Sequence, residues 1–174
     1  LNNHVTDFAR ARTLLEHCAL AFVLSGDVAQ LETAQLALSR ILDYKRWDYF
    51  LEGGEHTIGI QRASEGSIAV CCALDWLGDK LSPVIVAEAE RQLATKCAPA
   101  CYLTLYGMKY PDRVRGWGFD PEENFPVAID FRRWPLILNA TNLKIIPTAA
   151  LGMVAVWLHG RHLEANKWLE MSRQ

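Results

Sequence analysis

Two asparagines in the second half of the chain are the residues whose type and spacing best suit chemistry on a charged ligand. Asn139 and Asn142 are three positions apart, so they share a face if their segment is helical. An amide transfers no proton near neutral pH, but it can hydrogen-bond a carboxylate. Such a bond stabilises the negative charge that develops when a proton is removed next to a uronic-acid carboxylate. The structural alternative is that Asn139 caps a helix and Asn142 bonds loop backbone, and the residue types alone favour this alternative.

The residues just before this pair could bind the rest of an acidic sugar. Arg132 and Arg133 could hold a carboxylate or sulfate through the planar guanidinium group, while Trp134 or Trp117 stacks on a sugar face. The alternative is a solvated arginine pair that is balanced by the neighbouring acidic residues. Both interpretations stay open at this point.

A histidine in an earlier loop is a further candidate for the same site. His56 follows Glu55 in the segment 47–61 and could act as a general base or line a cleft. The glycines beside it match no phosphate-binding loop, so no nucleotide or other cofactor is expected.

Composition limits the class of protein. The chain has 174 residues, of which 51% are hydrophobic and 22% charged, and this is typical of one soluble globular domain spanning residues 1–174. Its apolar runs are too short for a membrane span, and no targeting segment is visible. A net charge of -2 excludes a globally basic surface of the kind that binds nucleic acid, although a local basic cluster remains possible.

The five cysteines indicate structural thiols. They form no paired CxxC framework, and four of them lie among apolar residues. Cys97 and Cys101 are four positions apart, but Pro99 lies between them and no second ligand pair is suitably spaced, so no metal site is expected. The odd number of cysteines favours a bacterial periplasm or cytoplasm over a disulfide-rich extracellular setting.

Hydrophobic periodicity predicts an all-α fold that is built from helical hairpins. Each of three units has an apolar helix, a glycine turn and an amphipathic helix, with turns at Gly26, Gly78 and Gly160. We expect the apolar helices inside and the amphipathic ones outside, either in an (α/α) toroid or in an open array. The predicted helix pairs span residues 8–25 and 28–44, 64–77 and 83–94, and 143–158 and 162–173.

Two long loops interrupt these units, at residues 47–61 and 102–134. The second exceeds the roughly 12 to 15 residues beyond which structureless loops become uncommon, and it is rich in aromatic residues, so a functional role is expected. Within it Tyr102, Tyr106 and Tyr110 recur every four residues, a spacing that favours packing on a helix.

The order of these features resembles the N-terminal toroid of heparinase II/III-like polysaccharide lyases. The resemblance rests on the hairpins, the aromatic loop, Arg-Arg-Trp at 132–134, Asn-x-x-Asn at 139–142 and the apolar helix that contains Trp157. It implies β-elimination on an acidic polysaccharide, with Asn139 neutralising the uronate carboxylate and Asn142 beside it. It also implies that a Tyr and a His acting as acid and base, and a C-terminal β-sandwich domain, lie past Gln174. The chain would then be a toroid that is incomplete at its C-terminus and inactive alone.

Two other classes of function remain in competition with a lyase. A glycoside hydrolase or sugar epimerase with an α/α toroid would need a carboxylate or histidine in the cleft, for example Glu55, Glu65 or Asp120. A helical-repeat binding module would need no chemistry at all, and its aromatic loop would contact a protein or a sugar.

Overall fold

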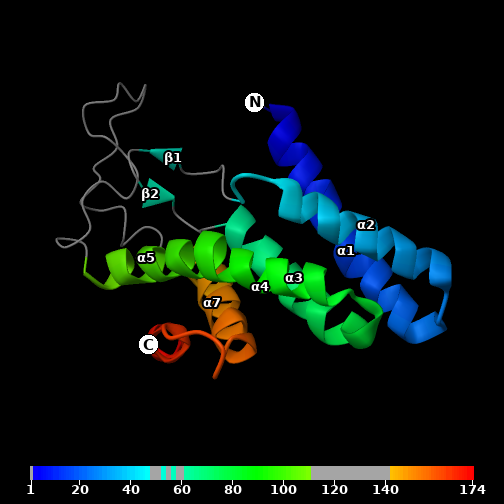
Figure 1. Ribbon diagram of the computed structural model, residues 1–174. Helices are drawn as coiled ribbons and strands as arrows, with labels where there is room; N and C mark the ends of the chain where they lie inside the picture. The colour runs from blue at the N-terminus through cyan, green and yellow to red at the C-terminus, as the bar shows by residue number, and fades with distance from the viewer. Residues whose placement is uncertain (1, 48–51, 54–55, 58–60, 111–141) are drawn as a thin grey trace.

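The prediction of an all-α fold is confirmed (Figure 1). The structure is a computed structural model that describes residues 2–47, 52–53, 56–57, 61–110 and 142–174. In these ranges the only strands are β1 (Glu52–Gly53) and β2 (His56–Thr57), which pair antiparallel with Glu52 opposite Thr57. The α-helices are α1 (Asn2–Ser25), α2 (Val28–Asp43), α3 (Arg62–Leu77), α4 (Pro83–Gln92), α5 (Ala98–Lys109), α7 (Ile145–Trp157) and α8 (Ala165–Ser172).

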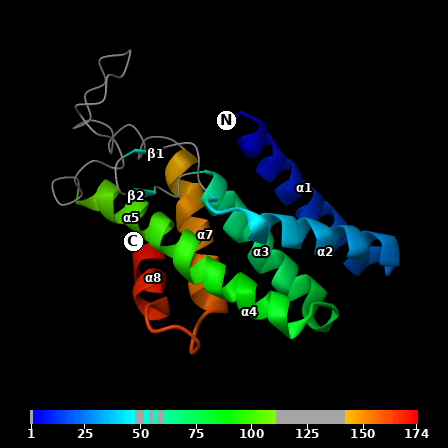
Figure 2. The ribbon, with the colours of Figure 1, turned by 45° about the horizontal axis from the view of Figure 1, so that its top comes forward.

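The helices pack as two rows (Figures 1 and 2). One row consists of α1, α3 and α7, and each of these helices packs against the next. The other row consists of α2, the α4–α5 pair and α8, which cover the first row from one side. Closure of the rows into a toroid stays a prediction. None of the helices in the described ranges is long and apolar enough to cross a membrane.

Three glycines reverse the chain where the sequence predicts turns. Gly26, Gly78 and Gly160 have φ angles of 70°, 49° and 73°, a left-handed conformation that side chains with a Cβ rarely adopt. The helices after the first two turns are then capped by oxygen side chains: Asp27 accepts from the Ala29 amide, and Ser82 accepts from the Ile85 amide.

The segment from Pro83 to Lys109 corrects the predicted start of the second loop. The helix continues past residue 94 through a π-helical turn, Leu93–Cys97, into α5, so Tyr102 and Tyr106 are helical. The turn ends two residues before Pro99. A proline inside a regular helix lacks an amide and clashes with the carbonyl four residues earlier, and the wider turn accommodates both effects.

The third hairpin differs from its prediction at two boundaries. A 3-10 turn, Asn142–Lys144, precedes α7, and α8 begins at Ala165 rather than at residue 162. His162 is the reason for the later start, because its Nδ1 accepts from the Glu164 amide at 3.2 Å and its ring stacks on Trp168 at 4.6 Å between centroids. His162 therefore has a local structural role at this turn.

Small residues on α3 allow the close packing of the first row. Gly66 faces Phe8 of α1, which is fully buried and makes an edge contact with the Tyr44 ring at 5.3 Å between centroids. Trp47 closes the same cluster at 6.1 Å from the Phe8 ring and is 1% exposed. This cluster fixes the position of α3. The N-terminus of α3 directly follows the first long loop in the chain.

Candidate functional site

The structure brings the starts and ends of several helices together at one end of the two rows, which we call the loop end. The N-termini of α3 and α7, the C-terminus of α5 and the β1–β2 hairpin all lie at this end (Figure 2). The helix ends that flank residues 111–141 and the start of α3 therefore lie on the same side. Variable loops at one end of such an array are where a binding cleft is expected.

Most of the predicted site residues lie outside the described residues. This holds for Asn139, Arg132, Arg133, Trp134 and Trp117. Their roles remain predictions.

Two further predicted residues are placed by their backbone. Asn142 begins the 3-10 turn that leads into α7, and His56 lies in β2 opposite Gly53. Strand β2 and the start of α7 lie at the loop end (Figure 2). The chain therefore carries Asn142 to the head of the apolar helix α7, where the sequence predicts a polar site.

A cavity of about 250 Å³ lies beside this head, between α5, α7 and α8. Four of its lining residues have polar or charged side chains: Lys109, Lys144, Thr148 and Gln174. The remaining wall is apolar and consists of Leu105, Met108 and Met171. We call this space the lysine cavity.

The lining of the lysine cavity is positively charged. Lys109 and Lys144 contribute two cations, and no acidic side chain lines the cavity in the described part of the chain. Lys109 donates to Oε1 of Gln174, and Lys144 forms no ion pair within the described ranges. The positive end of the α7 dipole and the negative ends of the α5 and α8 dipoles all lie at this cavity, so the two lysines are the source of its positive charge.

Sequence reasoning missed both lysines, although their positions carry a signal. Lys144 follows Asn142 by two residues and directly precedes the apolar helix α7, and Lys109 is the last residue of α5. Each is a cation at a helix end that borders a long loop. Only the packing of α5 against α7 shows that both line one cavity.

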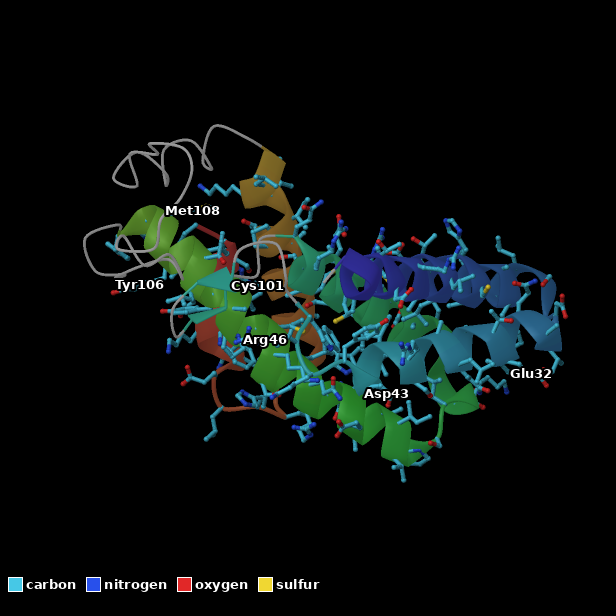
Figure 3. All side chains as sticks on the ribbon, turned by 90° about the horizontal axis from the view of Figure 1, so that it is seen from above. Glu32, Asp43, Arg46, Cys101, Tyr106 and Met108 are labelled. Atoms are coloured by element: carbon cyan, nitrogen blue, oxygen red, sulfur yellow. The ribbon has the colours of Figure 1, made fainter. Side chains whose placement is uncertain are left out.

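The tyrosine ladder on α5 confirms the interpretation that its spacing serves packing. Tyr102 stacks on Tyr106 at 5.9 Å between ring centroids, and Tyr106 contacts Tyr110 at 4.9 Å. Lys167 Nζ lies 4.8 Å from the Tyr102 centroid, and Lys109 Nζ lies 5.4 Å from that of Tyr110. Figure 3 shows Tyr106 on α5 near Met108, which lines the lysine cavity.

Charged residues also gather at the head of α3. Glu65 accepts from Arg62 at 3.1 Å, and its Oε2 lies 3.6 Å from Nε of Arg12 on α1. Arg12 also bonds Glu16 at 2.7 Å. Because two arginines already hold Glu65, this carboxylate serves the contact between α1 and α3.

A second and larger space of about 660 Å³ runs along α7, and we call it the α7 groove. Its wall is mainly apolar and includes Trp76 of α3 and Met153, Val156 and Trp157 of α7. Thr148 lines both this groove and the lysine cavity. Trp157 is already engaged there, because its indole donates to Glu90 at 3.1 Å and Arg161 lies over its ring.

The cysteines are free thiols, as expected. Burial raises the pKa of Cys71 to about 12 and that of Cys97 well above its usual value, so neither is a ready nucleophile or metal ligand. Cys101 lies 3.4 Å from the hydroxyl of Ser64 inside the core. Among the described residues no group of His, Cys, Asp and Glu is placed to hold a metal ion.

Comparisons of the chain with models of protein families, with curated proteins and with solved structures find no match. Function is therefore argued from the residues and the geometry above.

Proposed function

We propose that this chain is the substrate-recognition part of a polysaccharide lyase that cleaves a uronic-acid-containing polysaccharide by β-elimination. In this proposal Asn139 hydrogen-bonds the uronate carboxylate, with Asn142 beside it, and stabilises the charge that develops as the neighbouring proton leaves. Arg132, Arg133, Trp134, Trp117 and His56 contact the sugars around it. The proton itself is transferred by other groups.

One observation carries the proposal: Asn142 begins the 3-10 turn whose last residue, Lys144, lines the lysine cavity. Lys109 lines the same cavity. Among the described residues no carboxylate pairs with either lysine, and the chain as a whole is slightly acidic, so this positive charge is local and attracts anions. A site of this kind suits a polymer that carries carboxylates.

The proposal has a direct binding test with the chain itself. The chain is titrated in a calorimeter with an oligouronate and, separately, with a neutral oligosaccharide of the same length. The two binding affinities are then compared. We expect the oligouronate to bind with an affinity that falls as salt is raised, since exposed charge interactions are screened. Equal affinity for the neutral oligosaccharide would remove the reason for assigning a uronate substrate.

The α7 groove favours a second candidate, a helical-repeat binding module without chemistry. Its exposed apolar residues, among them Val156 at 64% and Trp76 at 36%, form a surface that suits a protein partner. This candidate predicts that Asn139→Ala leaves the function of the natural protein intact, whereas the lyase proposal predicts a large loss of turnover.

A glycoside hydrolase or epimerase is a weaker candidate. Among the acids considered for it, only Glu65 lies in the described part of the chain, and two arginines hold its carboxylate. A catalytic acid or base must reach the substrate, whereas this carboxylate is already engaged between α1 and α3.

A further inference from the structure

We propose that the lysine cavity is an anion subsite, which binds an oxyanion group on a sugar of the proposed acidic polysaccharide. The inference rests on the proposed function and extends it to the substrate. The oxyanion is a carboxylate or a sulfate ester, because both present several acceptor oxygens to lysine ammonium groups.

The charge of the cavity is the first reason. Lys109 from the end of α5 and Lys144 from the head of α7 converge on one space of about 250 Å³ from two different helices. Two like charges that line one small space repel each other, and an anion between them would offset this repulsion. In the described ranges neither lysine has a carboxylate partner, so a ligand can supply the missing negative charge.

The polar partners of the cavity are the second reason. Thr148 and Gln174 add a hydroxyl and an amide to the two ammonium groups. The Thr148 hydroxyl donates to the Lys144 carbonyl at 2.7 Å, which leaves its oxygen lone pairs to accept a bond from a sugar hydroxyl. Gln174 accepts from Lys109 and keeps its amide hydrogens for a ligand oxygen.

The apolar wall argues for a sugar and against a free inorganic ion. Leu105, Met108 and Met171 form the other side of the cavity, and Leu105 is 5% exposed. An inorganic ion gains nothing from contact with apolar side chains, whereas the apolar C–H faces of a sugar ring pack against them. Methionine adapts its shape to irregular ligands.

The proposal is tested by calorimetric titration of the chain with four probes: an oligouronate, its O-sulfated form, a neutral oligosaccharide and sodium sulfate alone. The variants are Lys144→Met and Lys109→Met, which keep the length of the side chain. Lys80→Met is the matched control, because Lys80 is half exposed and pairs with Asp79 in the turn between α3 and α4. Circular dichroism melting curves establish that each variant is folded.

We expect each cavity variant to bind the acidic oligosaccharides roughly tenfold more weakly, because each loses a hydrogen bond to a charged group. Its affinity should also depend less on salt, and Lys80→Met should bind like the unaltered chain. A preference for the sulfated probe identifies the oxyanion as a sulfate ester, and a preference for the oligouronate identifies it as a carboxylate.

Three results would overturn the subsite. They are unchanged binding by both cavity variants, an equal loss in Lys80→Met, and sodium sulfate binding as tightly as either oligosaccharide, which would mean an adventitious ion only. If the unaltered chain binds the acidic oligosaccharides and the cavity variants bind them equally well, the subsite fails while the proposed function stands. If the unaltered chain binds no acidic oligosaccharide, the proposed function fails as well.

Discussion

Phe8 of α1 packs directly on Gly66 of α3. A Cβ atom at Gly66 would lie 2.8 Å from Cζ of Phe8, closer than carbon atoms can approach without movement. Phe8 has little freedom to move, since it is fully buried between Tyr44 and Trp47. The first row of helices therefore depends on the absence of a side chain at position 66.

We predict that Gly66→Ala destabilises the protein by about 1 to 2 kcal/mol. Overpacking costs about 1 to 3 kcal/mol, and the better helix propensity of alanine returns up to about 1 kcal/mol. The free energy of unfolding in urea measures the effect. Gly152→Ala in α7 is the control, because its Cβ would meet only the Ser172 side chain, at 3.3 Å from Oγ. An equally large loss in the control would contradict a special role for the contact between Phe8 and Gly66.

A buried glutamine joins the outer helices. Gln92 is 2% exposed, and its amide donates to the Leu42 carbonyl at 2.8 Å near the end of α2. We predict that Gln92→Leu lowers the free energy of unfolding by about 1 to 3 kcal/mol, because the partly buried Leu42 carbonyl, Glu88 and Lys96 each lose a hydrogen-bond partner. Gln35→Leu is the matched control: Gln35 donates to the Lys80 carbonyl at the same distance, but in an exposed setting where water replaces the bond. If the two variants lose similar amounts of unfolding free energy, burial does not explain the contribution of Gln92 to stability.

The carboxylate of Glu88 should contribute a pH-dependent part of the stability. Hydrogen bonds from Arg91 and then Gln92 lower the pKa of Glu88 from 4.5 to about 2. A lowered pKa in the folded state stabilises the fold above the unfolded value of 4.5, and this stabilisation is lost as pH falls toward about 2.

We therefore expect Glu88→Gln to be less stable than the unaltered protein at neutral pH, with the difference shrinking between pH 4.5 and 2. The side chain is 39% exposed, so solvent screening limits the difference to less than about 1 kcal/mol. Urea titrations at several pH values measure it. Glu32→Gln on α2 removes the same charge at an exposed position (Figure 3). The prediction fails if that control shows the same pH dependence.

The cysteines should react with a thiol reagent in a definite order. Cys71 and Cys72 both line the α7 groove, but only Cys72 is partly exposed, whereas Cys18, Cys71, Cys97 and Cys101 are buried. Burial, together with Glu16 and Asp75, raises the pKa of Cys72, so we expect slow labelling at neutral pH. Mass spectrometry of the native protein should find one label at Cys72 before the others react. Simultaneous labelling of all five would show that the core opens faster than Cys72 reacts.

The sequence predicts the helical class and the three turns because both depend on local interactions. Gly26, Gly78 and Gly160 each end an apolar segment, and a left-handed residue at that place is a local requirement. The continuation of α4 into α5 was not predictable in this way. Pro99 is normally a helix breaker, and only the π-helical turn at Leu93–Cys97 makes it compatible with a continuous helix.

The candidate site was predictable only in part, for a related reason. Asn142 lies at the head of an apolar helix, as periodicity predicts. Lys109 and Lys144 are 35 positions apart and become members of one cavity only through the packing of α5 on α7. Such a contact between distant segments leaves no pattern in the spacing of residues.

The most direct measurement of the central claim is the rise in ultraviolet absorbance when the natural polypeptide that contains this chain is mixed with a polyuronate such as alginate. β-Elimination creates an unsaturated sugar, so we predict that absorbance rises with time. Asn139→Ala should slow this rise roughly 100- to 1000-fold with the fold preserved, as expected when one donor to a developing charge is removed. No rise with any uronate polymer, or an unchanged rate in Asn139→Ala, would contradict the role proposed for this chain.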